Sequence, residues 1–176
     1  MPIRFHEKKK EFHIYNDKIS YIFKILANGH LGHAYYGKRL TDREDFGCLI
    51  EYAMRDMAPC TFEGNNRFSL EHLKQEYPSY GSGDMRFPAF ELERTDGSRV
   101  VDFKYQKHEI YNGKKKLLGL PAVYVEEETE AETLEVTLED VQIGARIVLS
   151  YTIFQALPVI ARNTCFYCDG ESITLL

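Results

Sequence analysis

The sequence predicts an all-β fold, a β-sandwich with a long irregular excursion and at most a short helix. Two observations support this: apolar residues recur at every second position, and Asn-Asp, Asn-Gly or Asp-Gly pairs separate the alternating segments. A period of two places one row of side chains on each face of a strand. Asn-Gly and Asp-Gly pairs accept the positive φ values of tight hairpin turns. Short strands at this spacing are typical of a sandwich or barrel.

In the N-terminal part, strands are expected at residues 12–15, 19–26 and 31–36. The turns Asn16-Asp17 and Asn28-Gly29 lie between them. Segment 19–26 is apolar at both odd and even positions, so we expect this strand to be covered on both sides.

Further strands are expected in the second half of the chain. Asp96-Gly97 separates 90–94 from 99–105, and Asn112-Gly113 follows 109–111. The clearest alternation lies in 133–138 and 146–153, and 159–167 and 172–176 also read as strands. Because 172–176 ends in Leu-Leu without a polar cap, we expect the domain of residues 1–176 to be incomplete.

The excursion, residues 41–88, shows no sustained alternation. It contains three of the six prolines and seven aromatic residues. Long loops in compact domains are usually functional or disordered, and this aromatic content argues against disorder. We expect an ordered segment that packs on another part of the protein, with at most a short helix at 69–75, where Ser69 offers a cap.

Composition excludes several function classes. The chain has 176 residues and a net charge of −5 with both signs interspersed, so it lacks the clustered basic face of a nucleic-acid-binding protein. It has neither a signal-peptide core nor an apolar run of membrane-spanning length. We therefore expect a cytoplasmic protein with reduced cysteines and no membrane partner.

Two motifs resemble metal sites. Cys165 and Cys168 form C-x-x-C, and His30 and His33 are also three apart. Positions three apart on a strand point to opposite faces, so neither pair is expected to chelate. We predict no metal site and no cofactor.

Segment 75–90 is the most distinctive in chemistry. Its prolines and glycines restrict the backbone, Tyr77 and Tyr80 offer flat faces, and Glu76, Asp84 and Arg86 offer polar groups. Sugars bind to such combinations of aromatic faces and charged hydrogen-bonding groups. The alternative is a structural loop in which Asp84 and Arg86 pair with each other.

No pair of acidic residues stands out as a catalytic pair. A retaining glycosidase needs two carboxyl groups about 5–5.5 Å apart, and no spacing among the 27 acidic residues indicates one. Neither a nucleophile elbow nor a phosphate-binding loop is present.

Longer motifs resemble those of family 36 α-galactosidases. FSLEHLKQEYPSYGSGDMRFPAF at 68–90 is similar to the family's FSLD…QEYP.YG..D.R.PA signature. The stretch 97–138 resembles its Y..H.I..GK..L.GLPA.YVE...EAETLE pattern, and LGHAYYGK at 31–38 also resembles its counterpart. The resemblance covers essentially the whole chain.

This resemblance implies the N-terminal part of a three-domain enzyme: a β-supersandwich followed by a catalytic barrel and a C-terminal β domain. The family's nucleophile lies in a Lys-Trp-Asp motif of the barrel, and this chain contains no tryptophan. The segment alone is then expected to be non-catalytic. Its parent would be a retaining α-galactosidase that hydrolyses terminal α-galactosides such as melibiose and raffinose, and would form a homotetramer.

The resemblance also implies that the excursion reaches the mouth of the active site. Relatives carry an Arg just before Phe-Ser-Leu; here Arg67 immediately precedes Phe68, with Asn66 before it, so the Arg is shifted by one position from the family's pattern. Relatives also carry an Asp in the first part of this excursion. The ungapped match to that Asp is Met54, and the nearest carboxylates in this chain are Glu51 and Asp56. The candidate substrate-contacting residues are Glu51, Asp56, Asn66, Arg67, Tyr80, Asp84 and Arg86. The alternative function is a non-catalytic carbohydrate-binding or assembly module.

Overall fold

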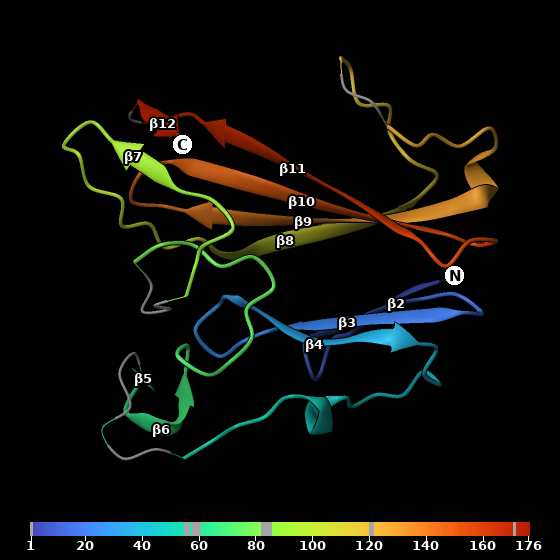
Figure 1. Cartoon of the computed structure of the whole chain (residues 1–176), viewed down its shortest axis with the longest axis horizontal. Helices are drawn as coiled ribbons and strands as arrows, with labels where there is room; N and C mark the ends of the chain where they lie inside the picture. Colours follow the sequence, from blue (N-terminus) through green and yellow to red (C-terminus); the bar gives the residue numbers. More distant parts are fainter. Residues whose placement is uncertain (1, 55–56, 58–60, 82–85, 120–121, 171) are drawn as a thin grey trace.

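Two four-stranded antiparallel sheets lie face to face and confirm the predicted all-β sandwich (Figure 1). The computed structural model describes residues 2–54, 57, 61–81, 86–119, 122–170 and 172–176. The first sheet has the order β1-β2-β3-β4 and contains β1 (Ile3–His6), β2 (Glu11–Tyr15), β3 (Ile19–Ile25) and β4 (Leu31–Lys38). The second has the order β11-β10-β9-β8 and contains β8 (Lys104–Asn112), β9 (Ala131–Asp140), β10 (Ala145–Phe154) and β11 (Ile160–Cys168).

Short elements connect and flank these sheets. Two small antiparallel pairs form from β5 (Thr61–Phe62) with β6 (Asn65–Ser69) and from β7 (Leu92–Arg94) with β12 (Ile173–Leu175). Two single-turn 3-10 helices are η1 (Gly47–Leu49) and η2 (Glu128–Glu130). Among the described residues, no helix is long and apolar enough to cross a membrane.

Alternating residues of the two sheets form one hydrophobic core. The inward row of β10 is almost completely buried and consists of Ile147, Leu149, Tyr151 and Ile153. Between the sheets, the Tyr151 ring stacks on Phe23 of β3 with 5.1 Å between centroids. The predicted alternation of β9 and β10 is therefore confirmed as the source of the core.

The excursion covers the outer side of the first sheet, so β3 is enclosed on both sides as expected. Leu26, just after β3, packs in a second buried cluster with Phe68, Leu70 and Leu73 of the excursion. Phe46 is also buried, and its backbone N–H donates to the Glu11 carboxylate on β2 at 2.7 Å. The described part of the excursion is thus ordered and packed, as predicted.

The predicted helix at 69–75 is wrong. Ser69 ends β6, and its hydroxyl accepts the Glu71 N–H at 3.2 Å, but only a turn follows. The next residues run beside β4, where the His33 N–H donates to the Lys74 carbonyl and the Glu76 N–H donates to the Leu31 carbonyl. These backbone bonds require an extended segment and compete with a helix.

The predicted strand at 99–105 is also largely wrong, because only Lys104 and Tyr105 belong to a strand. The Asp96-Gly97 turn forms, but β7 pairs with β12 instead of with residues 99–103. Those residues bond elsewhere: the Val101 N–H donates to the Tyr80 carbonyl, and the Asp102 N–H donates to the Asp140 carboxylate. Similarly, Asn112-Gly113 opens a long loop, because β8 pairs with β9, which begins only at Ala131.

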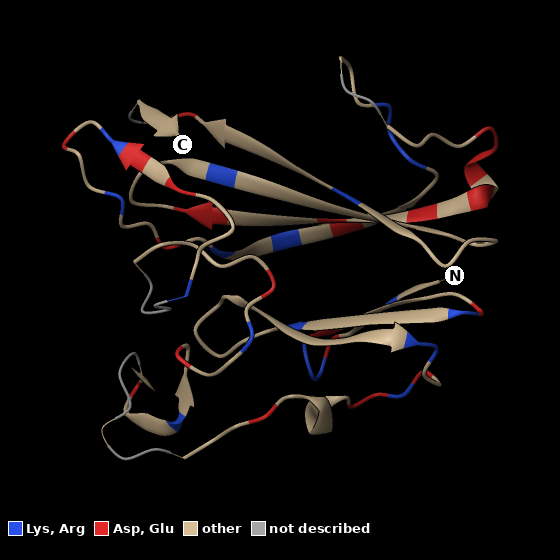
Figure 2. Ribbon diagram, in the orientation of Figure 1, with Lys and Arg blue, Asp and Glu red and all other residues tan. Residues whose placement is uncertain are grey.

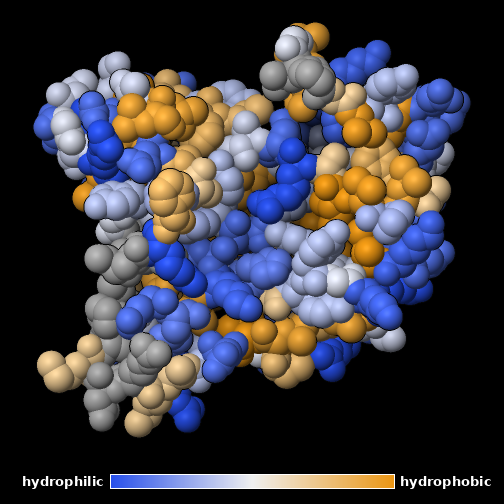
Figure 3. All heavy atoms as spheres, in the orientation of Figure 1, coloured by the Kyte–Doolittle hydropathy of each residue, from blue (hydrophilic) through white to orange (hydrophobic). Residues whose placement is uncertain are grey.

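Charge and hydropathy are unevenly distributed over the molecule. Figure 2 shows acidic residues concentrated at η2 and the start of β9, whereas basic residues are spread over both sheets and their loops. Figure 3 shows that on the same face hydrophilic residues separate several smaller apolar areas. The large apolar surface lies between the sheets, where it is buried.

Candidate functional site

The predicted site residues come from a segment that wraps one end of the sandwich. In Figure 1, β6 and the chain that follows it climb along the end of the sandwich opposite the N terminus, from below the first sheet towards β7. Bonds from this segment to β4 and to residue 101 fix its path. The ends of both sheets therefore support the loop region from which Asn66, Arg67, Tyr80 and Arg86 emerge.

Asn66 and Arg67 lie in β6, and both are exposed. As neighbours on a strand they project to opposite faces. Glu51 is also exposed, in the coil after η1. Asp56 and Asp84 lie outside the described residues. These positions keep Asn66, Arg67 and Glu51 available for contacts with other molecules.

Tyr80 is half-exposed, whereas Tyr77 is partly buried and packs against the core. The Tyr77 ring stacks on Phe90 with 5.3 Å between centroids. Of the two aromatic rings expected for sugar contact, Tyr80 is therefore the more accessible.

Arg86 holds the loop together. Its Nη2 donates to the carbonyls of Leu70 at 3.0 Å and of Leu73 at 2.5 Å. These carbonyls belong to the turn after β6, so the guanidinium joins two parts of the excursion. The structure thus shows that Arg86 supports the loop, and because this residue is also exposed, its contact with sugar stays a prediction.

Replacing Arg86 by Lys should destabilise the loop by about 1–2 kcal/mol, because the shorter, more strongly hydrated lysine side chain cannot bring its ammonium to the position from which Arg86 Nη2 donates to both carbonyls. Urea unfolding should show a lower midpoint with an unchanged slope. Arg39→Lys is the matched control, because Arg39 makes an exposed ion pair with Asp17, which is worth little. Equal midpoints for both variants would contradict this role of Arg86.

Glu76 joins the excursion to both sheets, and its role was missed by the sequence reasoning. Its side chain is buried, and Oε1 accepts hydrogen bonds from the hydroxyls of Tyr21 on β3 and Tyr151 on β10, at 2.5 and 3.0 Å. Arg162 on β11 lies 2.8 Å from Oε1, and His33 Nδ1 on β4 lies 3.0 Å from Oε2. One carboxylate from a loop thus bonds to four strands of two sheets.

The electrostatics of this cluster follow from burial and from the Glu76 charge. Burial, and then the neighbouring Glu76 carboxylate, raise the pKa of Tyr21 well above its usual range. The same causes raise the pKa of the more deeply buried Tyr151. Both phenols are therefore neutral donors to Glu76 at physiological pH.

The raised pKa of Tyr21 predicts a loss of stability at alkaline pH. A group whose pKa is raised in the folded state contributes fully to the unfolding free energy at any pH below its pKa in the unfolded chain, which is about 10 for tyrosine. This contribution is lost as the pH rises further. Between pH 9 and 11 the unfolding free energy should fall more steeply in the wild type than in Tyr21→Phe. Identical pH slopes in urea titrations would contradict this prediction.

The expected divergence of the two metal-like motifs is confirmed. His30 Nε2 lies 2.9 Å from the Asp102 carboxylate, whereas His33 bonds to Glu76. Cys165 and Cys168, three positions apart in β11, lie on opposite faces of the strand. Neither motif places its two side chains where they could bind the same metal ion.

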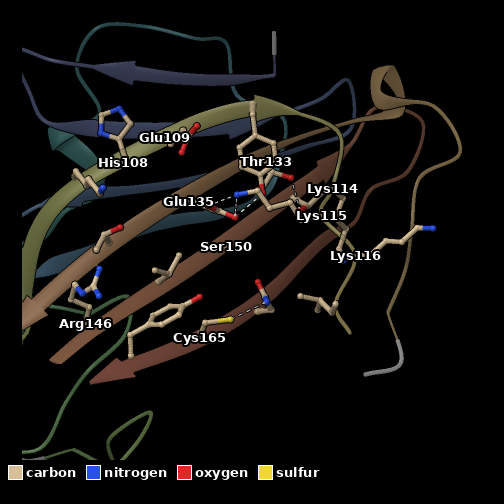
Figure 4. A pocket seen from close by; sticks show the side chains of 18 residues that line it. His108, Glu109, Lys114, Lys115, Lys116, Thr133, Glu135, Arg146, Ser150 and Cys165 are labelled. Atoms are coloured by element: carbon tan, nitrogen blue, oxygen red, sulfur yellow. Dashed lines mark hydrogen bonds and ion pairs between the residues drawn. The ribbon is translucent and has the colours of Figure 1, made fainter. Parts of the chain in front are cut away.

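A groove of about 630 Å³ lies on the outer face of the second sheet (Figure 4). Glu109 and Glu135 oppose each other across β8 and β9 there. Glu135, however, accepts hydrogen bonds from the Tyr111 hydroxyl at 2.7 Å and from Lys115 at 2.9 Å. The Lys115 ammonium also lies 4.5 Å from the centre of the Tyr111 ring. The groove therefore presents an internally paired carboxylate and a covered ring, which suit neither acid–base catalysis nor stacking against a sugar.

Comparison with known proteins identifies the family. Residues 29–175 match the glycosyl hydrolase family 36 N-terminal domain. α-Galactosidase AgaA of Geobacillus stearothermophilus is 40% identical over the whole chain, which spans 24% of that protein. A variant of this enzyme has been solved in complex with raffinose.

Solved structures agree with the sequence match. The α-galactosidase AgaB of G. stearothermophilus superposes on 99% of this chain with a TM-score of 0.89 and 40% identity, over 24% of its own length. The α-galactosidase of Lactobacillus brevis covers 98% with a TM-score of 0.92 and 34% identity, over 23% of its length. The chain thus spans about a quarter of these relatives, and it belongs to the glycosyl hydrolase family 36 N-terminal domain family.

Proposed function

We propose that this chain acts as the N-terminal β domain of an α-galactosidase. The parent enzyme would release terminal α-D-galactosyl residues from oligosaccharides such as melibiose and raffinose. The observation that carries this proposal is the whole-chain match to two G. stearothermophilus α-galactosidases at 40% identity. The raffinose complex of an AgaA variant supports a galactoside substrate.

The domain would supply scaffold, subunit contacts and the rim of the active site. By rim we mean the exposed residues Glu51, Asn66, Arg67 and Tyr80 of the excursion. The sandwich core and the Glu76 contacts support this segment at one end of the domain. We further propose that the parent enzyme is a cytoplasmic homotetramer.

Catalysis would come from residues outside this chain. A retaining glycosidase needs one carboxyl group that donates a proton and one that attacks the anomeric carbon. The buried Glu76 and the groove residue Glu135 are each held by cationic and phenolic donors. Both carboxylates are therefore engaged in contacts within the domain, which suits a structural role.

The alternative, a free-standing carbohydrate-binding module, has less support. Sugar-binding modules depend on exposed aromatic platforms, and in this chain one face of the partly buried Tyr77 is covered by Phe90. This leaves Tyr80 as the exposed ring of the two tyrosines first considered.

The test is an assay of the purified 176-residue chain with p-nitrophenyl α-galactoside, followed by calorimetric titration with galactose and raffinose. We expect no turnover above background, and dissociation constants weaker than about 1 mM, which corresponds to roughly 4 kcal/mol. Turnover that co-purifies with the chain would contradict a purely supporting role. Tighter binding would favour the carbohydrate-binding module.

A further inference from the structure

We propose that His6, His13 and Asp42 form a binding site for a divalent transition metal, with Zn²⁺ as the reference ion. His6 Nε2 lies 3.0 Å and His13 Nδ1 lies 2.7 Å from the same Asp42 Oδ1. All three donor atoms lie within 4.8 Å of one another. The site is separate from the excursion's rim and from the groove on the second sheet.

The register of the first hairpin brings the two imidazoles together. Arg4 opposes His13 and Phe5 opposes Phe12, so His6 and His13 lie on the same face of neighbouring strands, one step apart diagonally. Phe12 is in the core, which puts this pair on the outer face. Side chains at such diagonal positions can bind the same metal ion, unlike the pairs His30–His33 and Cys165–Cys168.

Asp42 completes the set from a different part of the chain. It lies just after β4, where the excursion begins to cross the first sheet. The Leu40 N–H donates to the Ser20 hydroxyl at 2.9 Å, which fixes the crossing beside His13. The aspartate therefore approaches on a tethered backbone rather than on a free loop.

The donor set and its spacing suit zinc. Zn²⁺ binds imidazole nitrogen and carboxylate oxygen at about 2.0–2.2 Å, which places neighbouring donors roughly 3–3.5 Å apart in a tetrahedron. The two nitrogen–oxygen distances are already close to this range. Two imidazoles and one carboxylate favour zinc and similar ions over Mg²⁺ or Ca²⁺, which prefer oxygen ligands.

The surroundings orient the ligands. His13 is fully buried, and its second nitrogen, Nε2, lies 2.9 Å from Ser20 Oγ. A metal-bound histidine usually donates its other ring N–H to such an acceptor, which fixes the ring and the tautomer. Tyr15 stacks on His13 at 4.4 Å between centroids, and Phe46 lies against its edge at 4.9 Å.

The other side of the site is open. The Asp42 side chain is 31% exposed and that of His6 is 14% exposed, so an ion can reach the donors from solvent. Three protein ligands with an open side leave room for a fourth ligand from solution. The competing explanation is a closed hydrogen-bond network, in which both imidazoles donate to Asp42 without any metal.

Zinc titration of the chelator-treated, tag-free chain distinguishes these explanations. We expect one Zn²⁺ per chain by calorimetry and by metal content after dialysis, together with a rise of the unfolding temperature in excess zinc. His6→Ala and Asp42→Asn should each weaken binding at least tenfold and remove the zinc-dependent rise. Both positions are partly exposed, so these variants should fold, as circular dichroism would verify.

His30→Ala is the matched control, because it removes another histidine–aspartate pair and should leave zinc affinity unchanged. The Co²⁺ form should show d–d absorption without the charge-transfer band of a thiolate ligand. The proposal is overturned if the wild type binds no zinc, or if the His6→Ala and Asp42→Asn variants bind zinc as tightly as the wild type does.

Discussion

Glu76→Ala is expected to lower the unfolding free energy by about 3–5 kcal/mol, the usual cost of removing one partner of a buried ion pair. The substitution leaves Arg162 without its carboxylate and removes the acceptor of two phenol hydroxyls. Both phenols are buried, so their hydroxyls cannot bond to bulk water instead. Urea unfolding monitored by circular dichroism measures the loss.

Two further variants define the cause. Glu76→Gln keeps an acceptor oxygen without the charge, so it should retain part of the stability. Glu93→Ala removes an exposed partner of Arg99 and should change the unfolding free energy by less than about 1 kcal/mol. If Glu76→Ala were no more destabilising than Glu93→Ala, Glu76 would not be joining the two sheets.

Asn16→Ala is expected to cost about 2–4 kcal/mol, because it leaves several backbone groups without partners. Asn16 Nδ2 donates to the carbonyls of Phe154 and Leu157, at 2.8 and 2.7 Å. Its Oδ1 accepts the N–H groups of Lys18 and Ile19, at 2.8 and 3.0 Å. This one side chain shapes the β2–β3 turn and fastens it to the end of β10.

Asn28→Ala is the matched control in the next turn. Asn28 Oδ1 accepts a single hydrogen bond, from the His30 N–H at 3.2 Å, so we expect a loss of about 0.5–1 kcal/mol. Chemical unfolding of the two variants in parallel gives the comparison. Losses of equal size would show that Asn16 acts only as a turn residue and not as a link between the sheets.

The sequence predicts a strand well where only one face of that strand enters the core, because apolar and polar residues then alternate. In β10, buried and half-buried residues alternate over 145–150, whereas in β9 most positions are buried and it is the apolar and polar residue types that alternate over 133–138. Prediction failed where tertiary bonds decide the backbone. Residues 99–103 have the composition of a strand, yet bonds to Tyr80 and Asp140 take the place of a sheet partner.

The candidate site was only partly accessible to sequence reasoning. Arg67 and Asn66 are exposed as a contact role requires, whereas Arg86 bonds to the loop and the partly buried Tyr77 packs against the core. Residue type alone cannot separate these roles, because an arginine can bind a sugar hydroxyl or a backbone carbonyl equally well. Partners of Glu76 come from strands distant in the sequence, so only the packed sheets reveal them.

A chimera tests most directly whether the rim serves an α-galactosidase. The 176-residue chain would replace the matching segment of G. stearothermophilus AgaA, to which it is 40% identical. Arg67→Ala would then be compared with Arg39→Ala, an exposed arginine at the end of β4, in raffinose hydrolysis.

We expect the folded chimera to hydrolyse raffinose, with Arg67→Ala lowering kcat/KM at least tenfold and Arg39→Ala leaving it unchanged. A folded but inactive chimera, or equal activity in both variants, would contradict a supporting role of this end of the domain at the active site.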